Sequence, residues 1–342
     1  MTRAVLGTAL LGRAVDAFGA PLDDGPAPRG AVRAFPRPLP APLERRPCTQ
    51  VCWTGVRAID GPLPFGRGAR IGVLGPAGAG KSTLVEAIER GVDADAIVVA
   101  LIGERGREAE RRVRAVGART TIVCATADRD PSERLAAAEL AFAQAEALCE
   151  RELDVVLVLD SLARVCHAAR DRAVAAGEPV GRAGYPASAF AHLTGLVERA
   201  GALGRGSITL LATVLGEGPD EHDPVAEAAR AALDGHLVLS ERLARAGHFP
   251  ALDLARSISR TAADAASAKH REAGRLVRAA VAALAESREA RALGLDVAGG
   301  DPFLARSLRA EAELDRFLRQ DDAPAPPAET LRRLELLADT LR

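Results

Sequence analysis

The stretch GPAGAGKSTLVEAI, Gly75 to Ile88, carries the spacing Gly75-x4-Gly80-Lys81-Ser82, which is typical of a phosphate-binding loop. The apolar segment RIGVLG precedes it and the helix-forming segment STLVEAI follows it. Glycines let successive backbone N–H groups turn toward one anion, and the following helix adds the positive end of its dipole. An ordinary glycine turn is the alternative, but the full pattern in this setting favours a phosphate site.

The loop predicts a role for individual side chains. Lys81 should reach the β- and γ-phosphates of a nucleotide, and the Ser82 hydroxyl should take a coordination position on Mg²⁺. Lys81 stands out because the chain has only one other lysine, Lys269. The candidate nucleotide-binding residues of the loop are Gly75, Ala77, Gly78, Ala79, Gly80, Lys81, Ser82 and Thr83.

Composition excludes several other classes of protein. The 342 residues carry a formal net charge of −1, so no global basic field exists to hold nucleic acid or an anionic membrane. The five cysteines form no CxxC pair, which favours a reducing cytoplasm over a disulfide scaffold. No apolar run approaches the length of a membrane span. The N-terminus could be read as a signal peptide, but Arg13 and Asp16 interrupt its apolar stretch early, and a short strand followed by a turn fits better.

Apolar runs and helical segments alternate through the middle of the chain. Buried strands alternating with helices predict an α/β fold with a mostly parallel sheet covered on both faces, followed by a small α-helical domain. We expect an N-terminal remnant and proline-rich linker at 1–50, a nucleotide-binding core at 51–262 and a helical domain at 263–342. The predicted strands are Arg70–Gly75, Ala96–Gly103, Arg119–Thr126, Asp154–Asp160, Ser207–Leu215 and Gly235–Ser240. The predicted helices are Ser82–Gly91, Gly106–Gly117, Pro131–Glu152, Ser188–Gly201 and the segments 263–294, 303–320 and 329–342.

Two of these strands end in carboxylates. Asp160 follows five consecutive apolar residues, so it should lie at the carboxyl edge of the sheet, where it can position hydrated Mg²⁺ or cap the next helix. The strand before GERGREAERRV delivers Glu104 to the same edge. A carboxylate there can orient the attacking water, and Arg105 beside it can neutralise charge on the γ-phosphate. Alone, the GERGRE stretch could be a solvated charge cluster.

Taken in order, these segments resemble the export ATPases of flagellar and type III secretion systems, which are similar in turn to the catalytic subunits of rotary ATP synthases. The resemblance runs from Thr54 to Arg260 and continues loosely into the C-terminal helices. It rests on the following segments: TGVRAIDGPLPFGRGARIGVLGPAGAGKSTL, ALIGERGRE, VLVLDSLARV, AAGEPVGRAGYPASAFAHLTGLVERAG, GSITLLATVL, DPVAEAARAALDGHLVLSERLARAGHFPALDL and SISR. It implies a RecA-like P-loop core, ATP as the nucleotide and Mg²⁺ as the metal.

The resemblance implies roles for further residues. Arg164 in DSLAR matches an arginine near the γ-phosphate, although a helix-surface arginine paired with a neighbouring carboxylate is the alternative. Arg260 in SISR matches the arginine finger that enters the active site of the adjacent subunit. Phe249 stands where the family usually has tyrosine at the adenine ring, though it could instead be plain core. Tyr185, the only tyrosine, is expected to be structural.

The resemblance also implies partners, and two departures bear on them. We expect a homo-oligomer (a hexamer), central stalk and peripheral stator proteins, and complexes of chaperone with substrate. The expected location is the cytoplasmic face of the bacterial inner membrane, with peripheral contact only. The family's N-terminal barrel is missing here, so the chain is either truncated or naturally short, and the ring should be weakened. In the C-terminal domain, ESREARALGLDVAGGDP replaces a segment near the family's stalk contact.

Several functions compete at this point. The leading one is Mg²⁺-dependent ATP hydrolysis at subunit interfaces, used to unload chaperones and prepare proteins for export. A nucleotide-binding subunit that does not hydrolyse is the second, and Glu104 argues against it because such subunits typically lack the water-orienting carboxylate. A rotary ATP synthase subunit is the nearest enzyme alternative. An RNA-translocating motor would need an RNA-binding module and basic loops, and neither is visible.

Overall fold

The computed structural model describes residues 2–215, 223–295 and 300–342. The chain divides into two compact units. Unit 1 comprises Met1–Cys48, Arg67–Leu74 and Ala94–Gly235, and unit 2 comprises Thr49–Gly66, Gly75–Asp93 and His236–Arg342. Each unit is assembled from segments distant in sequence, so each is described by itself.

Unit 1 is built on a mostly parallel sheet. Its strands follow in the order β5 (Arg70–Gly75), β10 (Gly206–Leu215), β8 (Asp154–Asp160), β6 (Ala96–Ile102), β7 (Thr120–Ala125) and β2 (Arg13–Val15). The pairs β10–β8, β8–β6, β6–β7 and β7–β2 are parallel. Every residue of β6 is buried, which is why its sequence reads as a continuous apolar run instead of an alternating one.

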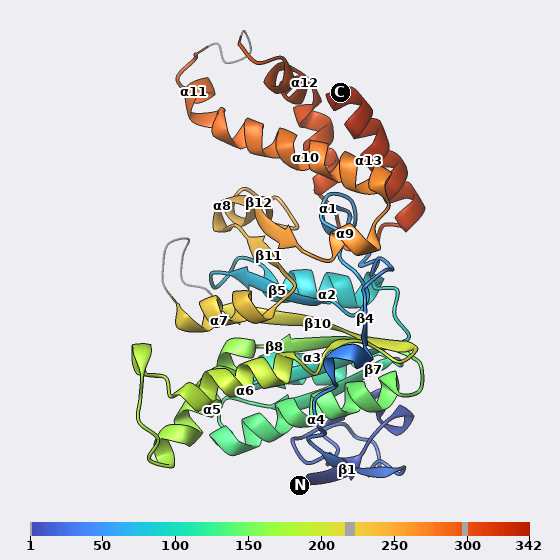
Figure 1. The fold of residues 1–342 in the computed structure, drawn as a ribbon, viewed down its shortest axis with the longest axis vertical. Coiled ribbons are helices and arrows are strands. Elements are labelled where there is room, and N and C mark those ends of the chain that lie inside the picture. The colour runs from blue at the N-terminus through green and yellow to red at the C-terminus, as the bar shows by residue number, and fades with distance from the viewer. Residues whose placement is uncertain (1, 216–222, 296–299) are drawn as a thin grey trace. The chain divides into compact units, whose positions relative to one another are not determined.

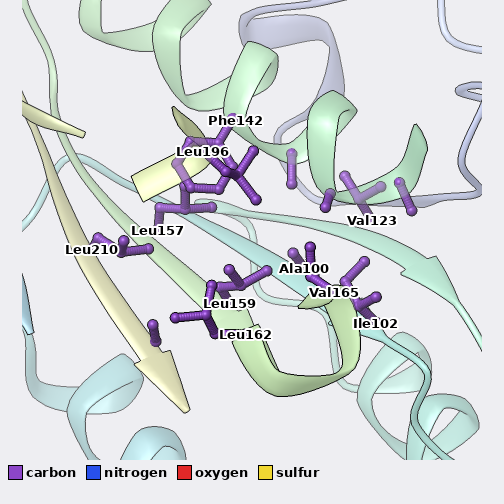
Figure 2. Close-up of a cluster of buried hydrophobic side chains, with 14 of the residues drawn as sticks. Ala100, Ile102, Val123, Phe142, Leu157, Leu159, Leu162, Val165, Leu196 and Leu210 are labelled. Carbon is purple, nitrogen blue, oxygen red and sulfur yellow. The ribbon is translucent and has the colours of Figure 1, made fainter. Parts of the chain in front are cut away.

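Helices cover this sheet and form the core with it. They are α3 (Gly106–Arg114), α4 (Pro131–Cys149), α5 (Leu162–Ala175), α6 (Ala187–Val197) and α7 (Pro224–Ala232). Helix α4 packs on β6, β7 and β8, and Asp130 caps it by accepting from Ser132 N and Glu133 N. Figure 2 shows side chains from β6, β8, α4 and α5 meeting in one apolar cluster that includes Ile102, Phe142 and Leu157.

The N-terminal region and the proline-rich segment contribute short strands to unit 1. Strand β1 (Thr2–Val5) pairs with β3 (Val32–Phe35), and β4 (Arg45–Arg46) pairs with β9 (Gly201–Leu203), in both cases antiparallel. The same region has 3-10 turns at Thr8–Leu10 and Pro42–Glu44, and a third 3-10 turn, Arg182–Gly184, lies between α5 and α6. The proline-rich segment was expected to be an extended linker, yet it contains β3 and β4, because its non-proline residues retain the N–H groups that strand pairing needs.

Unit 2 combines the phosphate-binding loop with the C-terminal helices. It contains α1 (Arg57–Asp60), α2 (Lys81–Gly91), the neighbouring strands β11 (Gly235–Leu239) and β12 (Leu252–Ser259), α8 (Glu241–Arg245), α9 (Ala262–Ala265), α10 (Ala268–Glu286), α11 (Arg288–Ala292), α12 (Pro302–Leu318) and α13 (Pro327–Leu341). Helices α10, α12 and α13 pack on one another (Figure 1), and α1 packs on α12 and α13. Over the described residues, no helix is both long and apolar enough to cross a membrane.

The predicted fold class is confirmed, and each predicted strand is present. The segment 263–294 was expected to be one helix and is three, α9, α10 and α11, because Ser267 caps α10 by accepting from His270 N and a break follows at Ser287. Residues 296–299 of the divergent C-terminal segment lie outside the described residues.

Candidate active site

The phosphate-binding loop runs from the end of β5 into α2. Gly78 and Gly80 have positive φ angles of 78° and 92°, a backbone conformation that favours glycine. Gly80 is the residue before the first turn of α2, where Lys81, Ser82 and Thr83 follow. Ser82 and Thr83 are exposed, whereas Ala79 is buried. The helix therefore presents polar side chains and its N-terminal N–H groups at the loop, the arrangement that binds phosphate.

Lys81 lies over the loop itself. Its Nζ donates to the carbonyl oxygens of Gly75 and Pro76 at 2.7 and 2.8 Å. These two hydrogen bonds hold the ammonium group of Lys81 against the backbone of the phosphate-binding loop. A nucleotide phosphate bound by the loop would therefore find the cation already in place.

A pocket of about 390 Å³ adjoins the loop within unit 2. Gly80, Thr83 and Phe249 line it, and the Phe249 side chain is 44% exposed, which rules out the alternative that it is plain core. A Cβ placed on Gly80 would lie 3.9 Å from the Phe249 ring. The ring is thus available for stacking on a base next to the phosphate loop.

Sequence reasoning missed part of this pocket. The pocket is also lined by Gln320, Asp321 and Asp322, which follow α12. The segment 303–320 was expected to be helical to its end at Gln320, but α12 ends at Leu318, so Gln320 joins Asp321 and Asp322 in the turn before α13. No local signal in a polar turn could show that it faces a loop so far away along the chain.

The carboxylates of unit 1 lie at the carboxyl edge of its sheet. Leu101 pairs with Asp160 in the β6–β8 register, and Glu104 follows the last residue of β6 by two positions, so both carboxylates lie at this edge. Thr213 Oγ1 on β10 donates to Asp160 Oδ1 at 2.5 Å and orients that carboxylate. The cap of α5 is Ser161, which accepts from Arg164 N at 3.3 Å, so Asp160 is not the helix cap.

Glu104 carries the most perturbed carboxyl group at this edge. Burial raises the pKa of Glu104 to about 7, with further contributions from Glu108 and from the negative charge of Asp160. Arg164 opposes this shift, with its Nη2 3.4 Å from Glu104 Oε1. The arginine reaches this position because Gly103 lacks a side chain, since a Cβ there would lie 2.9 Å from Arg164 Cδ.

The remaining candidates occupy simpler surroundings. Arg105 is the exposed residue that directly precedes α3. Arg260 is the exposed residue that directly follows β12. Tyr185 is 8% exposed, and its ring lies 5.3 Å from the Phe190 ring with the Arg170 guanidinium 5.4 Å from its centroid. These contacts fit a packing role for Tyr185. Structurally, Glu104, Asp160 and Arg164 come together in unit 1, and the loop and Phe249 come together in unit 2.

Comparison with known proteins matches the chain to two family models and to several relatives. The family described as "ATP synthase alpha/beta family, nucleotide-binding domain" matches residues 55–259, and the "T3SS EscN ATPase C-terminal domain" matches residues 266–335. A type 3 secretion system ATPase of Sinorhizobium fredii is 45% identical over 94% of this chain and 73% of its own length. The flagellum-specific ATP synthase of Salmonella typhimurium is 44% identical over 92% of this chain and 71% of its own length.

A solved structure agrees with these sequence matches. The assembled ATPase EscN from the enteropathogenic E. coli type III secretion system has a TM-score of 0.93 and 36% identity, covering 98% of this chain and 83% of that one. EscN in complex with its central stalk EscO gives a TM-score of 0.92 at 36% identity. The chain therefore belongs to the ATP synthase alpha/beta family, within its group of type III export ATPases.

Proposed function

We propose that this ATPase hydrolyses Mg-ATP by a water that Glu104 orients, with the γ-phosphate held by Lys81. The observation that carries the proposal is the half-buried Glu104 carboxyl, whose pKa of about 7 lets it act on a proton near neutral pH. Arg164 beside it supplies positive charge for the transferring phosphoryl group. A subunit that only binds nucleotide has no use for such a group, so hydrolysis is favoured over that alternative.

Mg²⁺ fits the donors that the chain offers. Among the described residues, no group of three or more His, Cys, Asp or Glu side chains could hold a metal by itself. Mg²⁺ does not need such a group, because it usually binds through one or two protein oxygens together with phosphate oxygens and water. We assign the Ser82 hydroxyl as a direct ligand and the Asp160 carboxylate, oriented by Thr213, as the group that positions its waters.

We further propose that the active enzyme is a ring, a hexamer, in which Arg260 of one subunit completes the site of its neighbour. The exposed position of Arg260 after β12 and the assembled state of EscN support this. By the same likeness, the helices of unit 2 would contact a central stalk, and stator proteins would hold the ring. Its work would be to release chaperones from export substrates at the cytoplasmic face of the inner membrane.

A comparison of the two lysines tests the phosphate assignment. Lys81→Ala should abolish ATP hydrolysis, measured as phosphate release, while the circular dichroism spectrum stays that of the parent. Lys269→Ala is the matched control, because Lys269 is exposed and pairs with Glu335 at 2.8 Å. Hydrolysis by Lys81→Ala at the parent rate would show that the loop is not the catalytic phosphate site.

A further inference from the structure

Gln320 makes an unusually complete set of hydrogen bonds at the edge of the base pocket. Its Oε1 accepts from Arg57 N at 2.9 Å, and its Nε2 donates to the carbonyls of Gly55 and Ala323 at 2.7 and 2.8 Å. Its backbone N–H donates to the carbonyl of Phe249 at 2.9 Å. Both hydrogens of the amide group and its oxygen are therefore engaged. Only an amide in this orientation satisfies all three side-chain partners.

The turn between α12 and α13, which contains Gln320, also packs against the C-terminal end of α2. A Cβ on Gly91, the last residue of α2, would lie 2.8 Å from the Thr54 carbonyl oxygen and 2.9 Å from Pro324 Cβ. Ala325 N donates to the Gly55 carbonyl at 2.8 Å. The turn after α12 thus contacts Phe249 at the pocket and both Gly55 and the end of α2 beyond it.

We propose that Gln320 is a positioning residue for the nucleobase. It holds the carbonyl of Phe249 and the Asp321–Asp322 turn at fixed places around the pocket, and so ties base binding to the C-terminal helices α12 and α13. The inference rests on the proposed base site at Phe249. It adds a residue from the C-terminal helical region that acts through its neighbours without touching phosphate.

A substitution that keeps the size of Gln320 but removes its donated hydrogen bonds distinguishes a positioning role from a general packing role. In Gln320→Glu a carboxylate oxygen would replace Nε2 and face two carbonyl oxygens, so two donated hydrogen bonds become repulsive contacts. The phosphate loop keeps its own contacts, because Lys81 bonds to Gly75 and Pro76 within the loop. Base affinity should fall while affinity for phosphate alone is kept.

The test compares ligands with and without a base on the full-length protein. ADP binding is measured directly, and inorganic tripolyphosphate is measured as a competitor of a fluorescent ADP analogue. We expect Gln320→Glu to weaken ADP binding about tenfold, with KM for ATP rising by a similar factor and kcat near the parent value, as loss of one or two hydrogen bonds implies. Inhibition by tripolyphosphate should be unchanged once corrected for the affinity of the analogue.

Two further variants make the outcome decisive. Gln144→Glu is the matched control: Gln144 is a buried amide of unit 1 that donates to Gly7 O at 2.9 Å, so its variant should lose stability but keep the parent ratio of ADP to tripolyphosphate affinity. Phe249→Ala should lose ADP affinity. If it does and Gln320→Glu does not, or if Gln320→Glu weakens both ligands equally, the positioning role is wrong. If both variants bind ADP as the parent does, the base site itself is wrong.

Discussion

Glu104 Oε1 lies 3.4 Å from Arg164 Nη2. The pair lies at the carboxyl ends of β6 and β8, where Asp160 ends β8. The pair places an acid of raised pKa beside a fixed positive charge. Burial disfavours the ionised carboxyl, whereas Arg164 favours it. The balance leaves the pKa of Glu104 at about 7. In the proposed mechanism, Glu104 is the base that acts on the attacking water and Arg164 is the cation that faces the phosphoryl group.

This balance sets the expected pH dependence of turnover. In the proposed mechanism Glu104 acts as the carboxylate, and burial raises its pKa to about 7, so kcat should rise with pH through about 7 and level off above it. At pH 6 it should be about tenfold below that plateau, as a single ionisation requires. Steady-state assays between pH 5.5 and 8.5 measure the profile.

Two substitutions support the assignment of that profile. Glu104→Gln should bind ATP like the parent but turn over very slowly, since an amide polarises water poorly. Glu110→Gln, in helix α3 that follows Glu104, should keep the parent profile, because Glu110 is exposed and pairs with Arg114. Equal loss of nucleotide binding in Glu104→Gln would mark Glu104 as structural.

Mixing two inactive variants tests catalysis between subunits. Lys81→Ala and Arg260→Ala should each be inactive alone and should regain activity when assembled together in equal amounts. Random assembly of a ring pairs an intact Lys81 with a neighbour's intact Arg260 at roughly a quarter of interfaces, so recovery should be partial. If co-assembly is shown and no activity returns, Arg260 acts within its own subunit or not at all.

Dilution should lower activity per subunit if each site needs a neighbour. Association follows mass action, so specific activity should fall as protein concentration drops below the assembly constant. Assays over a wide dilution series, with light scattering on the same samples, measure both quantities. Constant specific activity by a protein that stays monomeric throughout would exclude catalysis at an interface.

Removing the cation of a buried ion cluster should destabilise unit 1. The Arg199 side chain is 3% exposed and pairs with Glu139 and Glu146 on α4, with its guanidinium 5.4 Å from the Phe142 ring centroid. Arg199→Ala leaves two carboxylates without their cation and should cost about 3–5 kcal/mol of unfolding free energy. Arg205→Ala, which removes the exposed pair with Glu152, should cost about 0–1 kcal/mol. Urea denaturation of both variants distinguishes a buried network from a surface one.

Local sequence patterns were sufficient to predict the phosphate-binding loop and the position of two carboxylates at the sheet edge. The loop from Gly75 to Ser82 is contiguous, so its glycines, Lys81 and the following helix could be read directly from the sequence. Asp160 and Glu104 could be placed at one sheet edge because buried apolar runs end immediately before them and parallel strands share a carboxyl edge. The register of β6 and β8 confirms that placement.

Tertiary structure alone decided the rest. Nothing in a polar turn after α12 shows that Gln320 would bond to Phe249, Arg57 and Gly55, or that Gly91 would pack on Pro324. The partner carboxylates of Arg199 were equally hidden. The physical reason is the same in each case: a buried polar group must find a partner, and which distant segment supplies it depends on how the whole chain packs.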